Sequence, residues 1–227
     1  MEPNPHDRIV ELLKEKISLK QDVYEKTKST FMRMKELLFS MAGDLTKRIK
    51  LLDKELVVSC RESGEFEVEF TLADETLLFV MHTNIFTFDS SHLIWKQPYV
   101  QADKNRSYCG KIFIYNFLSD SFKYNRINDL GYLIGRIFIN KEGHFFVEGR
   151  KQMGYLYNDF ASAELNDDAL FKIIEAAVMF SLDFDPFTPP FEQQGEITVR
   201  DVNDASLQSR ITTGKRLGFR FQSDNNF

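Results

Sequence analysis

The side chains that most often carry catalysis or bind metals are few in this chain and lie far apart in its sequence. They are His6, His82, His92, His144, Cys60 and Cys109. Zinc sites in proteins use four ligands, commonly in closely spaced pairs, and no such pair occurs here. His82 and the two cysteines fall on segments predicted to be strands, where a cluster is conceivable. We favour a buried structural histidine and two free cysteines instead.

Two carboxylates offer a second candidate chemistry. Asp183 and Asp185 flank Phe184 near the end of a predicted helix. In an extended chain a spacing of two directs both side chains to the same face, and paired acids can bind a cation or divide acid and base roles. The negative end of a helix dipole disfavours carboxylates, and prolines follow. A solvated turn is therefore the preferred interpretation.

A basic and aromatic stretch near the C-terminus is the third candidate. Gly214 and Lys215 match part of a phosphate-binding loop, but Arg216 stands where the loop needs Ser or Thr, and Ser209 stands where it needs its first glycine. Cations interleaved with aromatic rings can instead contact phosphates and stack on bases. Nucleic-acid binding is thus one alternative for this arm, and solubilising charge is the other. The candidate arm residues are Arg216, Leu217, Phe219, Arg220 and Phe221.

Composition and charge limit the classes of protein to which this chain can belong. With 227 residues, 43% of them hydrophobic, the chain can bury a substantial core. Residues 1–54 carry 12 Lys/Arg against 9 Asp/Glu, a net +3, whereas residues 159–200 carry 2 against 9, a net −7. No apolar run approaches the roughly 20 residues that span a bilayer, and no targeting segment is evident. We expect a cytoplasmic protein without membrane attachment, cofactor, metal or catalytic site.

The elements that must position any site begin with a long helix. Apolar residues recur with alternating spacings of four and three through the first fifty residues, which predicts one helical face. A continuous helix of roughly 45 residues would measure about 65–70 Å, longer than a body about 40 Å across. Gly43 leaves open the alternative that the helix breaks and folds back. The predicted interface residues are Leu13, Ile17, Tyr24, Phe31, Met34, Leu38 and Met41.

The period changes from helical to two after Lys54. Phe66, Val68, Phe70 and Leu72 alternate with polar residues, which predicts an antiparallel strand with one buried face. Further strands are expected at residues 56–60, 76–88, 93–95, 111–118, 132–140 and 144–148. Because no crossover helix separates these segments, we expect an antiparallel meander of about six strands.

A second helix is predicted from Asn166 to about residue 183, with Asn166 as its cap and the next two acidic residues favouring its positive end. Prolines then end regular structure. The predicted fold class is α+β, with a helical segment at 1–54, a sheet-plus-helix domain at 55–190 and an extended or disordered arm at 191–227.

These patterns favour a non-catalytic intracellular protein that forms a homo-oligomer through its N-terminal helix and binds a protein partner through the helix or the arm. Two alternatives stay open. The first is a small-molecule sensor or enzyme with a pocket between the sheet and the second helix, lined by His82, Tyr115, Tyr132 and Arg136. The second is a nucleic-acid-associated protein that uses the basic arm.

Overall fold

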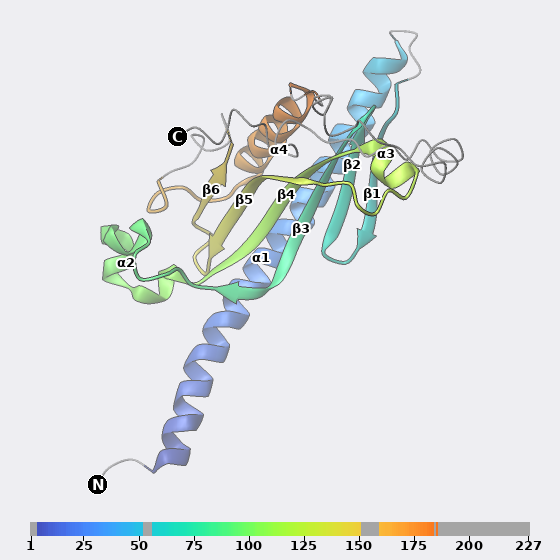
Figure 1. Ribbon diagram of the computed structural model, residues 1–227. Coiled ribbons are helices and arrows are strands. Elements are labelled where there is room, and N and C mark those ends of the chain that lie inside the picture. The colour runs from blue at the N-terminus through green and yellow to red at the C-terminus, as the bar shows by residue number, and fades with distance from the viewer. Residues whose placement is uncertain (1–3, 52–55, 151–158, 184, 186–227) are drawn as a thin grey trace, which may run out of the picture.

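The computed structural model describes residues 4–51, 56–150, 159–183 and 185. It shows the predicted α+β fold, in which a long helix and a shorter one pack on an antiparallel sheet (Figure 1). The elements are α1 (Pro5–Lys50), β1 (Val58–Gly64), β2 (Glu67–Leu72), β3 (Glu75–Phe86), η1 (Leu93–Lys96), α2 (Pro98–Ala102), η2 (Lys104–Ser107), β4 (Cys109–Leu118), α3 (Ser119–Lys123), β5 (Tyr132–Asn140), β6 (Phe145–Gly149) and α4 (Asp167–Leu182).

Helix α1 is continuous over 46 residues. The Asn4 side chain accepts a hydrogen bond from the His6 backbone N–H at 3.1 Å, and Pro5 occupies the first turn, where a missing N–H costs nothing. The helix passes through Gly43 without a break. Its neighbours Met41 and Ala42 are buried in the core, and packing of this turn outweighs the low helix propensity of one glycine. The expected long rod is confirmed.

The six strands pair in sequence order, and every pairing is antiparallel, as the absence of crossover helices predicts. The alternation in β2 is confirmed, because Val68, Phe70 and Leu72 are buried. Residues 93–95 are the exception. They form η1 instead of a strand, since the His92 ring accepts a hydrogen bond from the Ile94 N–H at 3.2 Å and caps the turn.

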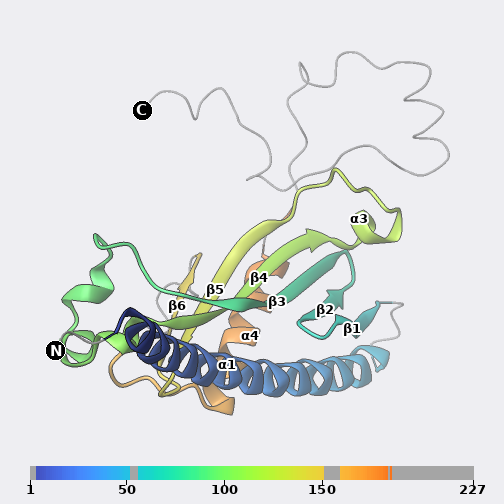
Figure 2. The ribbon, with the colours of Figure 1, turned by 90° about the horizontal axis from the view of Figure 1, so that it is seen from below.

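Helices α1 and α4 cover the same face of the sheet (Figure 2). Their buried residues meet those of β2 to β6 in one core, which includes Phe31, Phe70, Phe79 and Phe145. Arg33 joins the two helical segments, because its Nη2 donates to the Leu165 carbonyl at 2.7 Å.

The opposite face of the sheet is covered at one corner. There Phe138 of β5 and the neighbouring Phe146 of β6 form a second, smaller cluster with Ile94 of η1 and Val100 of α2. Over β3 and β4 this face carries no helix in the described ranges (Figure 1). We call this part the open face.

A polar network fastens the segment 93–107 to the β5–β6 hairpin. The Tyr99 hydroxyl donates to Glu142 Oε2 at 2.6 Å and accepts from the buried Asn140 Nδ2 at 2.9 Å. Arg106 Nε donates to Glu142 Oε1 at 2.9 Å, and its guanidinium lies 4.2 Å from the centre of the Tyr99 ring. Burial, followed by the bond to Glu142, raises the pKa of Tyr99 to about 12, so the phenol keeps its proton and serves as a donor.

The surroundings of two glycines, one on β4 beneath α1 and one on α1 itself, predict opposite effects of substitution. A Cβ at Gly110 would lie 2.0 Å from Thr27 Oγ1, so we expect Gly110→Ala to lower the free energy of unfolding by about 1–3 kcal/mol. At Gly43 a Cβ would enter open space on the helix, so we expect Gly43→Ala to raise that free energy by up to about 1 kcal/mol. Urea unfolding of both variants measures the difference, and equal effects would contradict this packing.

The Tyr99 network predicts a pH-dependent effect. Tyr99→Phe leaves Asn140 Nδ2 buried without its acceptor, which we expect to lower the free energy of unfolding at pH 7 by about 1–3 kcal/mol. Burial raises the pKa of Glu142, but hydrogen bonds from Tyr99 and Arg106, with the charges of Arg106 and Lys141, outweigh it and lower the pKa overall. A carboxyl whose pKa is lowered in the folded state stabilises the fold at pH values above its ordinary pKa. This contribution disappears as the pH falls through the pKa of Glu142 in the folded state.

The destabilisation by Tyr99→Phe should therefore be smaller at pH 4 than at pH 7. Urea unfolding at both pH values measures this difference. Tyr108→Phe, at a partly exposed tyrosine next to the same segment, serves as the matched control. A constant difference between Tyr99→Phe and the native chain across this range would show that Glu142 takes no part in it.

Candidate functional site

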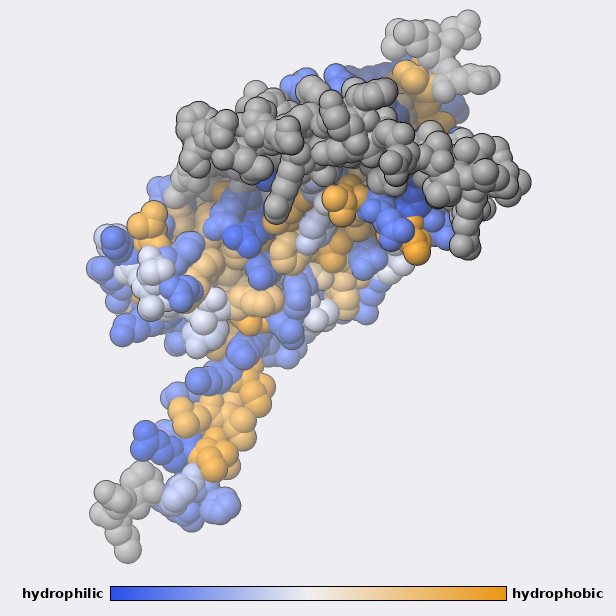
Figure 3. Space-filling model, viewed as in Figure 1, coloured by the Kyte–Doolittle hydropathy of each residue, from blue (hydrophilic) through white to orange (hydrophobic). Residues whose placement is uncertain are grey.

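The first part of α1 carries an apolar stripe that the rest of the described chain leaves uncovered. Residues 4–18 are all exposed, and the first fully buried residue of the helix is Val23. We define the bare stripe as the large apolar side chains of this overhang, which are 46–59% exposed. They are Ile9, Val10, Leu12, Leu13 and Ile17. Figure 3 shows a nearly continuous apolar band on the projecting helix.

The bare stripe continues the face of α1 that packs on the sheet. With 3.6 residues per turn, Ile9 and Leu13 project in nearly the same directions as Met34 and Leu38, both of which are fully buried. The helical face is therefore one surface, and the sheet covers only its second half (Figure 1). An amphipathic helix owes most of its stability to the packing of its apolar face, so the overhang lacks the contacts that stabilise the remainder.

A groove of about 600 Å³ lies where α1 emerges from beneath the sheet. The far end of β3 forms one wall and α1 forms the other. Ile17 belongs to both the groove and the bare stripe, so the two surfaces are continuous. The lining residues are Ile17, Lys20, Gln21, Tyr24, Thr83, Asn84, Ile85 and Phe86.

The structure divides the seven predicted interface residues into two groups. Leu13 and Ile17 are exposed on the bare stripe, and Tyr24 is half-buried at the groove, where its ring meets that of Phe66 edge-on with centres 6.5 Å apart. The other four lie in the core of the chain itself. These are Phe31, Met34, Leu38 and Met41. Periodicity identifies the correct face but contains no signal for the point where the sheet begins to cover it.

The four predicted pocket residues are not gathered between the sheet and α4. His82, Tyr115 and Arg136 point away from α4, because they alternate with buried residues that face the helices. Tyr132 pairs with Asn116 and packs against the helix-covered core, where burial raises its pKa. The space between α4 and the sheet is filled by core side chains.

The open face of the sheet is apolar over its two central strands. Phe113 and Tyr115 stack with ring centres 5.8 Å apart, and Leu78 and Val80 lie beside them on β3. All four are half-buried instead of exposed. Figure 3 shows apolar side chains in this region, with charged ones around them. On a sheet face that contacts water, the side chains are normally polar. The apolar side chains of Leu78, Val80, Phe113 and Tyr115 therefore mark a second surface with apolar character.

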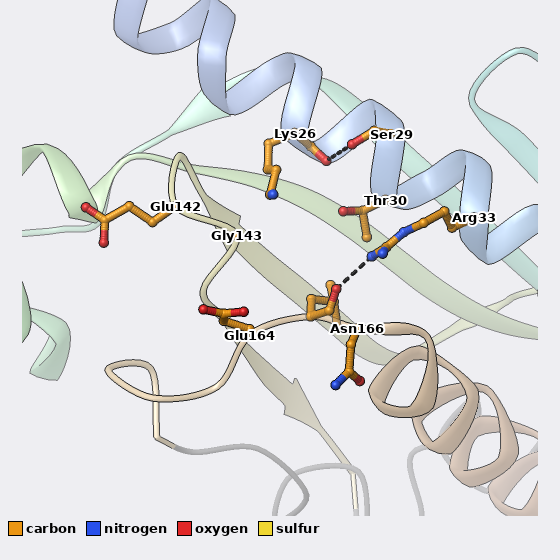
Figure 4. A pocket seen from close by; sticks show the side chains of 9 residues that line it. Lys26, Ser29, Thr30, Arg33, Glu142, Gly143, Glu164 and Asn166 are labelled. Carbon is orange, nitrogen blue, oxygen red and sulfur yellow. Dashed lines mark hydrogen bonds between the residues drawn. The ribbon is translucent and has the colours of Figure 1, made fainter.

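A polar cleft of about 310 Å³ separates α1 from the β5–β6 turn and the residues before α4 (Figure 4). Arg33 closes one end, with Nη1 3.3 Å from Asp167 Oδ1 in addition to its bond to the Leu165 carbonyl. Lys26 packs over Gly143, where the backbone φ is +82° and a Cβ would lie 2.5 Å from Lys26 Cε. Through these contacts, Arg33 and Lys26 of α1 hold the start of α4 and the β5–β6 turn against the helix.

The thiols are poorly suited to nucleophilic chemistry. Burial raises the pKa of the Cys60 thiol to about 11, and it raises that of the fully buried Cys109 further. Both cysteines are free. Since the thiolate is the reactive form, neither is an activated nucleophile at neutral pH.

The other sequence-level candidates are equally separate. The His82 ring packs edge-on against Phe86 at 4.8 Å and accepts a hydrogen bond from the Asn84 N–H. Asp183 follows the last turn of α4, and both it and Asp185 are exposed. Within the described ranges no three His, Cys, Asp or Glu side chains come together as a metal site. The candidate arm residues lie outside the described part of the chain.

Sequence reasoning misses one type of contact, a buried lysine. Lys35 is 3% exposed, and its ammonium donates to the carbonyls of Gly64 and Glu65 at 3.2 and 2.9 Å and to Glu62 Oε2 at 3.1 Å. It fastens the β1–β2 turn to α1. A lysine beside an apolar seam is ordinary in sequence, so only the three-dimensional position of the turn reveals this role.

The bare stripe and its adjoining groove therefore form an apolar candidate interaction site. A further groove of about 770 Å³ lies between α1 and α4, around Met41, Phe171 and Met179. No helix in the described ranges combines the length and apolar character needed to cross a membrane. Comparisons of this chain with known protein families, with curated proteins and with solved structures found no match.

Proposed function

We propose that this chain is a non-catalytic assembly protein that self-associates through the bare stripe of α1. The observation that carries the proposal is that five large apolar side chains, each about half exposed, continue a helical face that is otherwise buried. Monomeric proteins seldom expose contiguous apolar surfaces of this kind unless they bind something.

The size of the stripe suits a reversible dimer. Full burial of one such side chain contributes roughly 1.5–3 kcal/mol, and a half-exposed side chain recovers about half of that. The stripes of two copies together would then contribute about 8–15 kcal/mol, which is comparable to the cost of association, put at about 4–15 kcal/mol. A micromolar dissociation constant needs a surplus of about 8 kcal/mol over that cost. We expect the dimer to reach it with a cost of association at the lower end of this range and with further burial in the groove at Tyr24 and Phe86.

The alternative of a small-molecule site receives less support from the geometry. The expected pocket would lie between the sheet and α4, and that space holds core side chains such as Ile112 and Ile173. His82, Tyr115 and Arg136 instead lie on the side of the sheet away from α4. Binding of a protein or nucleic-acid partner through the C-terminal arm stays a prediction from sequence.

Self-association predicts that one added charge on the stripe will dissociate the protein. Ile17→Glu places a carboxylate in the proposed interface, where its desolvation is costly, so we expect the dissociation constant to rise at least tenfold, or about 1.4 kcal/mol. Ser18→Glu adds the same charge one residue further on, on the opposite side of the helix, and should leave the constant unchanged. Sedimentation equilibrium measures both. A native chain that is monomeric at about 100 μM, well above the expected micromolar constant, would falsify the proposal.

A further inference from the structure

The shape of the subunit restricts how a second copy can lie on the bare stripe. The stripe and the sheet lie on the same side of α1, and the sheet begins to cover that side near Val23. Packed helices lie with their axes about 8–10 Å apart, which is also close to the distance between a helix and the sheet that it covers. A partner helix on the stripe therefore approaches the end of the sheet.

A parallel partner cannot continue past this point. Beyond its own residue 20, the partner's helix would have to run along the stripe side of the first copy's α1, and the first copy's sheet already lies there. Its own sheet, carried on the stripe side of its helix, would need the same space. An antiparallel partner avoids both collisions, because its body lies beyond the N-terminal end of the first helix.

We infer that two copies pair antiparallel through their overhangs, with the N-terminal turn of each α1 entering the groove at the rim of the other's sheet. This inference rests on the proposed self-association. With the overhang spanning residues 5–21, a two-fold axis near Leu13 places Pro5 of one copy opposite Gln21 of the other, and Gln21 lines that groove. The length of the overhang thus matches the distance from the axis to the groove.

Charge favours the same orientation. Lys16 and Lys20 interrupt the apolar stripe on its own face. In a parallel, in-register pair each lysine would face its own copy across the interface, a like-charge contact that disfavours pairing. In the antiparallel pair centred near Leu13, the two copies of Lys20 are separated by about 20 Å along the helix axis. The two copies of Lys16 are about 9 Å apart in the same measure.

Distances between spin labels on the full-length chain distinguish the arrangements. Glu11→Cys and Met32→Cys place labels on exposed positions of α1 away from the stripe. Cys60→Ser removes the half-buried native thiol, and Cys109 is buried. Pulsed dipolar spectroscopy of each singly labelled variant, at concentrations above the dissociation constant, should give about 20–30 Å for the residue 11 pair, from the helix spacing and the reach of the labels. The residue 32 pair should be about 60 Å apart, from an axial offset of about 1.5 Å per residue on each side of the axis.

The other two outcomes overturn the inference at different levels. Short distances of similar size at both positions mean a parallel pair, which refutes the orientation while leaving self-association intact. A sample in which neither position gives an intermolecular distance, together with a monomeric mass by light scattering, refutes both the orientation and the proposed function. If the Glu11→Cys variant loses helical circular dichroism, the label is placed at Lys14 instead. If the Met32→Cys variant does so, the label is placed at Glu36. Both of these positions are also exposed.

Discussion

Burial of one face of a 46-residue helix is the constraint on which this structure depends. The sheet and α4 supply that burial from Val23 to Leu45, and the strand pairings present an apolar surface to the helix. At Gly110 the strand has no room for a side chain, because Thr27 of the helix occupies the space. The helix nevertheless begins at Pro5, well before its cover. A helical segment of that length is marginal in water without packing, and this is why the proposed function is based on the overhang and not on a pocket.

Much of the fold follows from periodicity, which depends only on local geometry. The four-three pattern predicts α1, the alternation from Phe66 to Leu72 predicts β2, and Asn166 with its acidic neighbours predicts the start of α4, where its side chain accepts from the Ala169 N–H at 2.9 Å. The apolar letters of residues 93–95 predict a strand, and this prediction is wrong. The conformation there is decided by side-chain caps from His92 and Asp89, whose competition with strand pairing a hydrophobic pattern does not contain.

The candidate sites are harder to predict because they depend on which face of the sheet each side chain joins. His82 and Arg136 are strand residues with polar ends, but their positions within β3 and β5 direct them away from α4. A shift of one residue in a strand exchanges the two faces, and the irregular pairing between Ile114 and Tyr115 adds such a shift between β4 and β5. Buried contacts such as Lys35 with the Gly64 carbonyl depend on residues far apart in sequence, so no local pattern indicates them.

The open face is another apolar surface of the described chain, and its geometry distinguishes it from the bare stripe. On the open face, Phe113 and Tyr115 stack on one another, and the Lys111 ammonium lies 3.3 Å from the centre of the Phe86 ring and 5.3 Å from that of Phe113. Neighbouring side chains bury Phe113 and Tyr115 more deeply than the side chains of the bare stripe, so a partner would remove less water from each. The side chains of the bare stripe lie on a projecting helix, where the described residues offer no such cover. Because the hydrophobic driving force grows with the apolar area removed from water, and because helix formation itself gains from packing there, each contact on the stripe contributes twice. A partner that covered the stripe would stabilise both the resulting complex and the helix that carries the stripe.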